Sequence, residues 1–165
     1  MTMTFTVKDG VPSMRFETHD SASMLFRHVD IDLAAYPMLT WRWYVELPIR
    51  SPLDERTREG DDHPARLFLL FRTARGDKRA MEVIWGNRLR AGDYKYIGGF
   101  PHFVADGGDE RVGRWLDERI DLAHVYAEIW KDAAPTHVVD VAVFCDSDNT
   151  YRSISYFAYV GLERR

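Results

Sequence analysis

The sequence predicts an all-β fold, an antiparallel β-sandwich of jelly-roll type with one short helix. Apolar and polar residues alternate with the two-residue period of strands through most of the chain. Turn-forming glycine, proline and aspartate residues separate these runs. Helical periodicity occurs in one good segment, residues 121–132. At 165 residues the chain fits a single domain, which we place at residues 1–165.

The first half of the chain predicts short strands. Three pairs of apolar residues stand two positions apart with polar neighbours: Phe5 and Val7, Met14 and Phe16, and Met24 and Phe26. The clearest strand covers residues 39–47, in which Leu39, Trp41, Trp43, Val45 and Leu47 share one face. Residues 48–64 are charged and interrupted by proline and glycine, which indicates a long solvated loop.

A second set of strands is predicted beyond this loop. Residues 65–71 are apolar on both faces apart from Arg66, which is typical of a central strand, and residues 80–85 pair with them across a turn. Shorter strands are expected near 94–97, 102–104 and 115–120. Asp121 caps the helix of residues 121–132, whose apolar stripe is typical of a surface helix. Residues 137–145 and 153–162 form the last two strands.

Composition excludes several classes of function. The net charge of −4 and the pI near 5.8 give no basic footprint, so nucleic acid is not an expected partner. No run approaches ~18 apolar residues, so no membrane-spanning helix is expected.

The single cysteine, Cys145, is expected to be a buried thiol. The start of the sequence lacks a signal peptide, which predicts a cytoplasmic protein if the chain is complete and an exported one if a leader has been removed. The oligomeric state is left open.

The best candidate for a site follows the strand at 137–145. Asp146, Ser147, Asp148, Asn149 and Thr150 come directly after it, so a buried strand delivers several hydrogen-bonding side chains to one place. Asp146 and Asp148 supply the hard oxygen ligands of calcium, with Asp61, Asp62 or backbone carbonyls completing the shell. The same side chains could instead satisfy the backbone of a tight turn or contact a polar ligand. These three interpretations stay open. Calcium is the one cofactor that the sequence suggests.

Arg66 is the second feature, because an unpaired charge inside an apolar strand is costly. We therefore expect it to be buried and paired with Asp62, Asp146 or Asp148, either as a structural ion pair or as an anchor for a ligand. Trp85 and the aromatic residues near it could stack on a sugar or pack in the core. The predicted ligand-binding set is Asp62, Arg66, Trp85, Asp146, Asp148 and Asn149.

Several motifs resemble those of a known family. They are Pro37-x-Leu39-x-Trp41-Arg42-Trp43, Asp61-Asp62-x-Pro64-Ala65-Arg66, Trp85, Trp115-x-x-Glu118-Arg119 and Asp146-x-Asp148-Asn149-Thr150. In this order they resemble the bacterial domain of unknown function 3047 family over nearly the whole chain. The resemblance implies a sandwich similar to galactose-binding-like jelly rolls, whose members often bind sugars and hold a structural calcium ion. The resemblance to these jelly rolls is one of fold.

The sequence thus predicts non-catalytic binding of a carbohydrate or a similar polar small molecule. One alternative is a glycoside-active enzyme that uses paired carboxylates, for which Glu46, Glu82, Asp62 and Asp148 are available. Another is a protein-interaction module that uses the loop at 48–64. Catalytic residues are not identified, because the six histidines are scattered without the spacing of metal ligands.

Overall fold

The computed structural model describes residues 1–132, 134–149 and 152–165. These residues form eleven strands and one α-helix, with a short 3₁₀-helix at Asp109–Arg111. The strands in chain order are β1 (Thr2–Lys8), β2 (Val11–His19), β3 (Ala22–Asp32), β4 (Met38–Leu47), β5 (His63–Thr73), β6 (Lys78–Gly86), β7 (Tyr94–Ile97), β8 (Phe100–Gly107), β9 (Trp115–Asp121), β10 (Thr136–Asp146) and β11 (Arg152–Glu163). The helix α1 covers Leu122–Trp130.

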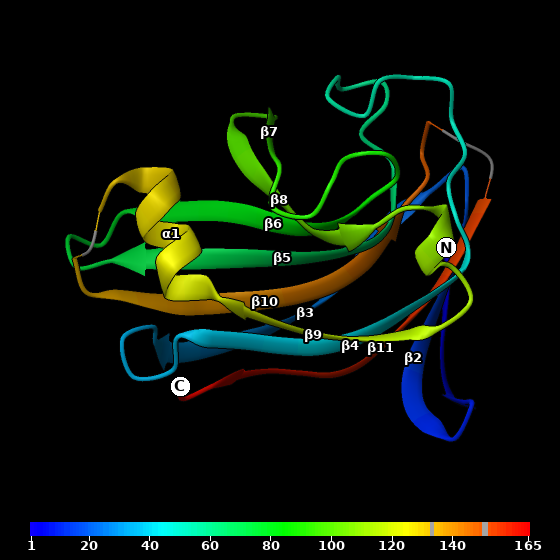
Figure 1. Cartoon of the computed structure of the whole chain (residues 1–165). Helices are drawn as coiled ribbons and strands as arrows, with labels where there is room; N and C mark the ends of the chain where they lie inside the picture. Colours follow the sequence, from blue (N-terminus) through cyan, green and yellow to red (C-terminus); the bar gives the residue numbers. More distant parts are fainter. Residues whose placement is uncertain (133, 150–151) are drawn as a thin grey trace.

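The strands form two sheets packed face to face (Figure 1). The five-stranded sheet has the order β1-β2-β11-β4-β9, and the six-stranded sheet has the order β3-β10-β5-β6-β8-β7. Four antiparallel pairs, β2/β11, β3/β10, β4/β9 and β5/β6, alternate between the sheets and nest inside one another along the chain. This nesting is the double Greek key of a jelly roll. The predicted fold class is therefore confirmed.

One strand departs from the antiparallel prediction. β8 runs parallel to β6, with Glu82 in register with His102, while β7 adds to β8 in antiparallel fashion. The six-stranded sheet is consequently mixed. The connection between β6 and β8 contains the short strand β7, which gives the chain enough length to return in the same direction.

The core lies between the inner faces of the two sheets. The alternation predicted for residues 39–47 places Trp41 and Trp43 inside, with 2% and 0% of their surface exposed. Trp43 makes edge-to-face contacts with Trp41 and with Trp85 of the opposite sheet, at ring-centroid distances of 5.2 and 5.7 Å. The Trp43–Trp85 contact joins the two sheets, and aromatic rings bury large apolar areas in this edge-to-face geometry.

The helix is the one predicted. Asp121 caps α1 by accepting a hydrogen bond from the backbone N–H of His124 at 3.0 Å. Tyr126 and Trp130 pack on Phe71 of β5, with ring centroids 5.0 and 5.7 Å apart. Figure 1 shows α1 lying over one end of the six-stranded sheet. The apolar stripe of α1 belongs to the core there. No helix of the described residues has the length and apolar character that crossing a membrane requires.

The loop between β4 and β5 is more ordered than its composition predicts. Glu55 is buried, and its carboxylate accepts hydrogen bonds from the backbone N–H groups of Asn87 and Arg88 at 2.8 Å each, and also from that of Leu89. The prediction of a wholly solvated loop was therefore wrong. A buried carboxylate that accepts backbone N–H groups fixes the loop to the turn after β6.

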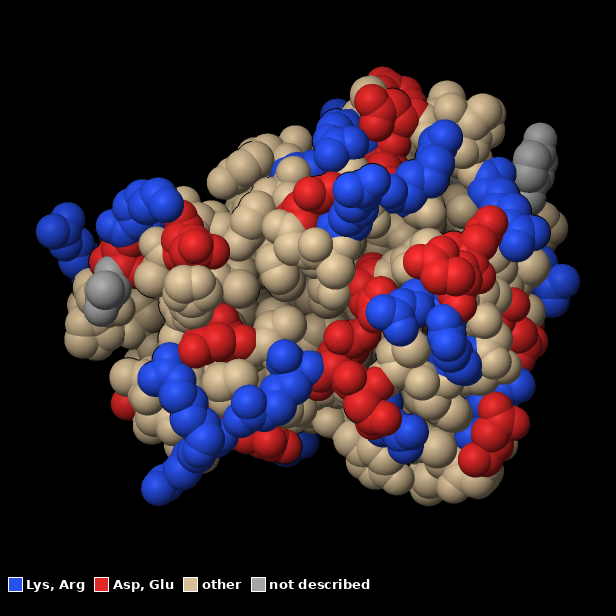
Figure 2. Space-filling model, viewed as in Figure 1, with Lys and Arg blue, Asp and Glu red and all other residues tan. Residues whose placement is uncertain are grey.

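Charges of both signs cover the surface. On the face drawn in Figure 2, lysine and arginine side chains are interspersed with aspartate and glutamate side chains. Exposed charges in this arrangement form several ion pairs, for example Arg72 with Asp30 at 2.9 Å. Such exposed pairs contribute little to stability.

Candidate functional site

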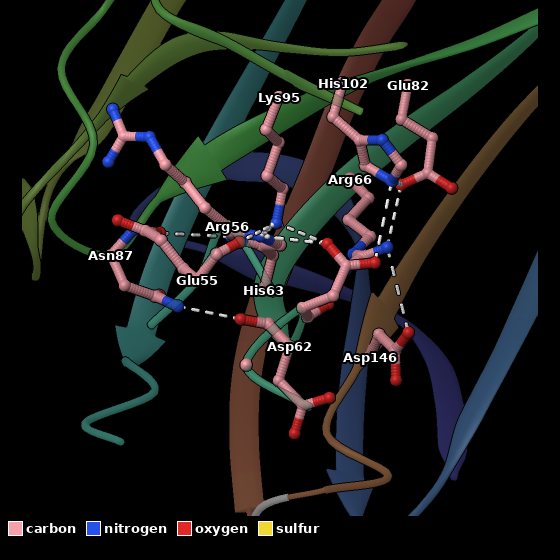
Figure 3. Close-up of polar contacts among 12 residues, drawn as sticks. Glu55, Arg56, Asp62, His63, Arg66, Glu82, Asn87, Lys95, His102 and Asp146 are labelled. Carbon is pink, nitrogen blue, oxygen red and sulfur yellow. Dashed lines mark hydrogen bonds and ion pairs between the residues drawn. The ribbon is translucent and has the colours of Figure 1, made fainter. Parts of the chain in front are cut away.

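A cluster of charged side chains lies on the outer face of the six-stranded sheet. In β5, Ala65, Leu67 and Leu69 point into the core, so Arg66 between them points outward. Glu82 reaches the same face from β6, and His102 reaches it from β8. Figure 3 shows Glu82, His102 and Asp146 arranged around Arg66.

Arg66 is the centre of this cluster. Its side chain is 3% exposed, and its guanidinium Nη1 donates to Glu82 Oε2 at 2.8 Å. Asp61 Oδ1 lies 3.3 Å from Nη2, and Asp146 Oδ2 lies 3.8 Å from Nη1. The guanidinium also rests against the ring of Phe144, 5.4 Å from its centroid. Three carboxylates therefore surround one buried cation.

Asp61 links this cation to three further groups. Lys95 Nζ donates to Asp61 Oδ1 and to the ring of His63, whose Nε2 lies 2.6 Å away. His102 Nε2 lies 3.6 Å from Asp61 Oδ2 and 3.4 Å from Glu82 Oε2. His63 Nδ1 is 2.7 Å from the carbonyl oxygen of Trp85. The cluster is thus one connected polar network with buried members from β5, β6, β7 and β8.

The network is the polar floor of an open cleft of about 400 Å³. Its lining includes Asp61, Arg66, Glu82, His102 and Asp146, together with the apolar residues Met24, Ile97, Phe100 and Phe144. The Phe100 ring stacks on the His102 ring, with centroids 5.0 Å apart and an interplanar angle of 16°. A few converging polar groups among apolar and aromatic walls are typical of a small-molecule site.

Burial separates the pKa values of the carboxylates. Desolvation raises the pKa of Glu82 to about 7 against the opposing effect of the Arg66 guanidinium, and it raises the pKa of Asp146 to about 6. Burial acts in the same direction on Asp61. Its hydrogen bond with His63 and the charges of Arg66 and Lys95 outweigh that effect, so its pKa lies well below the usual range. Asp61 is therefore ionised at pH 7, while Glu82 titrates near neutrality.

The two histidines of the network are neutral at pH 7. Burial lowers the pKa of His63 to about 3 and that of His102 to about 4, and the nearby Arg66 and Lys95 charges act in the same direction. Burial also lowers the pKa of Lys95, against the attraction of Asp61. A neutral imidazole both donates and accepts a hydrogen bond. The Nδ1 of His102 donates to the carbonyl oxygen of Phe100 at 3.3 Å, so its Nε2 can accept a hydrogen bond from a hydroxyl group of a ligand.

The structure places the predicted site residues, apart from Trp85, in two adjoining groups. Arg66 is buried as predicted, and Asp146 lies within ion-pair distance of it. The shortest carboxylate contact of Arg66 is with Glu82, which is not one of the three expected partners. Among the described residues, Arg66 forms no ion pair with Asp62 or Asp148. Asp62 accepts hydrogen bonds from the backbone N–H and side-chain amide of Asn149 at 3.0 and 3.3 Å.

The calcium interpretation concerns Asp62, Asp146 and Asp148. One carboxylate oxygen of each lies within 4.8 Å of the others. These ligands suit calcium in kind, yet calcium takes roughly six to eight oxygens, and the contacts with Asn149 already occupy Asp62. The turn interpretation has its own support, since Asp146 Oδ1 accepts the backbone N–H of Asp148 at 3.3 Å. Thr150, the last residue of the predicted segment, lies outside the described residues.

Trp85 does not belong to the cleft. Its indole is 1% exposed and packs on Trp43 between the sheets. The alternation of β6 explains this position, because Met81, Val83 and Trp85 point inward while Glu82 points outward. A stacking contact between Trp85 and a ligand is therefore incompatible with the fold, and Phe100 and Phe144 supply the aromatic surface of the cleft instead.

Sequence reasoning missed much of the network. The sequence pattern names Glu82 only as one of several carboxylates. It does not indicate that the network residues Asp61, Lys95, His63 and His102 lie together. A usable signal was present at Glu82, because it stands alone in the apolar run 81–85 as Arg66 does in its own strand. Two opposite charges in neighbouring central strands predict an ion pair.

Comparison with known families adds one identification. The model of the family described as "Protein of unknown function (DUF3047)" matches residues 2–161. The chain belongs to this family. The resemblance seen in the motifs is thereby confirmed over nearly the whole chain. No curated protein matches the sequence.

Two solved structures of similar shape have functions named in their descriptions. One is a carbohydrate-binding module specific for non-crystalline cellulose, with 11% identity and a TM-score of 0.47 over 99% of this chain and 82% of that chain. The other is a family 12 xyloglucanase from Bacillus licheniformis, with 12% identity and a TM-score of 0.45 over 98% of this chain and 77% of that chain. At such scores neither protein informs the function of this chain, and the jelly-roll assignment rests on the strand order.

Proposed function

We propose that the cleft above Arg66 binds a small hydroxyl-rich ligand, a carbohydrate or a molecule of similar polarity, without transforming it. The observation that carries this proposal is the pre-built polar floor. Arg66, Glu82 and His102 come from three neighbouring strands and are held rigidly by one another. Side chains fixed on strands bind with little further loss of conformational entropy.

The cleft offers the two kinds of contact that a sugar needs. Glu82 and Asp146 can donate or accept hydrogen bonds with hydroxyl groups, because their pKa values of about 7 and about 6 allow neutral forms near those pH values. His102 Nε2 can accept one, since its Nδ1 donates to Phe100. Phe100 and Phe144 supply apolar walls for the C–H faces of a sugar ring. A volume of about 400 Å³ lies at the lower end of the range for small-molecule sites.

The arrangement of charges favours binding over catalysis. Glu82 and Asp61 both contact Arg66, and these ion pairs occupy carboxylate oxygens that a nucleophile or base would use. One observation nonetheless supports the glycoside-active alternative. The pKa of Glu82 is raised to about 7 while that of Asp61 is lowered, and two carboxylates with separated pKa values can divide the roles of acid and base.

Isothermal titration calorimetry with a panel of mono- and oligosaccharides tests the binding proposal. We expect saturable binding of at least one sugar, and at least a tenfold loss of affinity in Glu82→Gln. The matched control is Asp140→Asn, because Asp140 lies on β10, as Asp146 does, and pairs with His28. Binding that survives Glu82→Gln unchanged would place the sugar site elsewhere.

Aryl glycosides with a chromogenic leaving group distinguish the two functions. Non-catalytic binding predicts no release of the chromophore beyond the buffer rate, even with glycosides that bind. Release that requires both Glu82 and Asp61 would replace the binding proposal with the glycosidase alternative. Neither binding nor release across the panel would remove carbohydrates as the ligand class.

A further inference from the structure

A second, apolar crevice opens between the two sheets, on the side of the sandwich where β3 forms the edge of the six-stranded sheet. Its volume is about 640 Å³. The side chains that line it come from β2, β3, β4, β10 and β11, and they include Met14, Leu25, Val29, Leu39, Val141 and Val160. The crevice is distinct from the cleft above Arg66, and no lining residue belongs to both.

Strand pairing explains why the sandwich is open here. β11 runs from Arg152 to Glu163, yet β2 pairs with it only up to Phe157. Beyond that point β11 has β4 on one side and no described strand on the other. The pairing with β4 is interrupted between Ala158 and Gly161, where Tyr159 has a φ of 54°. The residues of β3 opposite the end of β11 beyond Phe157 therefore line the crevice and have no described strand facing them there.

The inner row of β3 forms one wall of the crevice. Leu25 and Arg27 pair with Val143 and Val141 of β10 and share their face, which is the face turned toward the other sheet. The row continues with Val29, which packs against the core. The sequence alternation thus places one arginine in a wall that is otherwise apolar.

Arg27 is the only charged residue among the described residues that line this crevice. It is exposed, and none of the described residues forms an ion pair with it. Arg42, by contrast, lies against the ring of Trp115 and pairs with Asp117 at 2.6 Å. The crevice is therefore an apolar slot with one exposed cation, Arg27, which forms no ion pair with the described residues.

We propose that this crevice binds the hydrocarbon chain of a fatty acid, with the carboxylate of the ligand at Arg27. An apolar slot of this size excludes sugars, because it offers them no hydrogen-bonding partners apart from Arg27. A hydrocarbon chain gains free energy with each methylene removed from water. The guanidinium selects an anionic head group by a bidentate, charge-assisted hydrogen bond.

Fluorescence titration with dansyl-labelled undecanoic acid, below its critical micelle concentration, tests this proposal. We expect saturable enhancement of the dansyl fluorescence and displacement by unlabelled fatty acids. Affinity should rise about fourfold per methylene from octanoic to dodecanoic acid, which is the increment for burying one methylene group. No saturable enhancement, or an affinity independent of chain length, would overturn the proposal.

Two variants test the location. Arg27→Gln should weaken dodecanoic acid at least tenfold while leaving dodecanol unchanged, because only the acid uses the cation. Arg58→Gln, in the exposed loop before β5, is the matched control and should change neither. Val29→Phe should weaken acid and alcohol alike by filling the slot, and thermal melts confirm that each variant is folded. An acid affinity unchanged in both Arg27→Gln and Val29→Phe would place the ligand elsewhere and overturn the assignment.

Discussion

Arg66 and Glu82 form a buried ion pair across neighbouring central strands, with 2.8 Å between Nη1 and Oε2 and with side chains 3% and 6% exposed. The same guanidinium pairs with Asp61 at 3.3 Å. Asp146 lies farther away, with 3.8 Å between its Oδ2 and Nη1 of Arg66. Arg66 is thus the one cation that all three carboxylates share, and Lys95 is a second cation for Asp61. Desolvating these groups is costly, and the network offsets that cost only while it is complete.

Removal of the guanidinium should therefore destabilise the fold strongly. We expect Arg66→Ala to lower the free energy of unfolding by about 3–5 kcal/mol, because it leaves Glu82 and Asp61 buried without their main cation. Urea unfolding followed by tryptophan fluorescence measures this change. Arg72→Ala is the control on the same strand, since the Arg72–Asp30 pair is exposed and should cost less than about 1 kcal/mol. Equal effects of the two substitutions would contradict the role of the network.

The pH dependence of stability should show two opposing contributions. Glu82 and Asp146 have pKa values raised to about 7 and about 6, so they take up protons on folding. Their stabilising contribution is present below their unfolded pKa values and is lost as pH rises through the folded ones. His63 and His102 have pKa values lowered to about 3 and about 4. Their contribution is present above about pH 6.5 and is lost as pH falls through the folded values.

The variant Glu82→Gln separates these contributions. We expect the difference in free energy of unfolding, wild type minus variant, to fall as pH rises from about 4.5 to about 7, by at most about 1.4 kcal/mol per pH unit. Denaturant unfolding at several pH values measures this slope. Glu59→Gln, in the exposed part of the loop before β5, controls for the loss of one charge. A difference that rises with pH would show that the pKa of Glu82 is not raised.

The Glu55 carboxylate should hold the loop between β4 and β5 in place. Glu55→Ala leaves the backbone N–H groups of Asn87 and Arg88 without their acceptor, which should cost about 2–4 kcal/mol. Hydrogen exchange at these amides and protease cleavage within residues 48–62 should both accelerate. Glu59→Ala, an exposed change in the same loop, should leave both rates unchanged. Equal protection in the two variants would mean that other contacts hold the loop.

Calcium binding by Asp62, Asp146 and Asp148 stays a prediction. Because the described carboxylates fill only part of a calcium shell, we expect weak binding, with a dissociation constant on the order of 10⁻⁴–10⁻³ M. Millimolar calcium should then raise the thermal midpoint, and Asp148→Asn should abolish the rise while leaving the fold intact. Identical midpoints in calcium and in chelator would leave the aspartates with a role in the turn alone.

The sequence alone determined the fold class, because the period of apolar residues is a local property of the chain. The alternation in residues 39–47 placed Trp41 and Trp43 inside, and the stripe after Asp121 gave the one α-helix of the described residues. The apolar run around Arg66 predicted the central strand β5 and the burial of the Arg66 side chain. Each of these features depends on residues a few positions apart.

The tertiary structure decided which side chains meet. Glu82 and Asp61 reach Arg66 because β6 and the loop before β5 lie beside it. His102 of β8 reaches Glu82, and the parallel return of β8 has no signature in the local pattern. The inward position of Trp85 depends in the same way on the register between strands. A shift of one residue reverses the face of every side chain in a strand, and long-range pairing fixes that register.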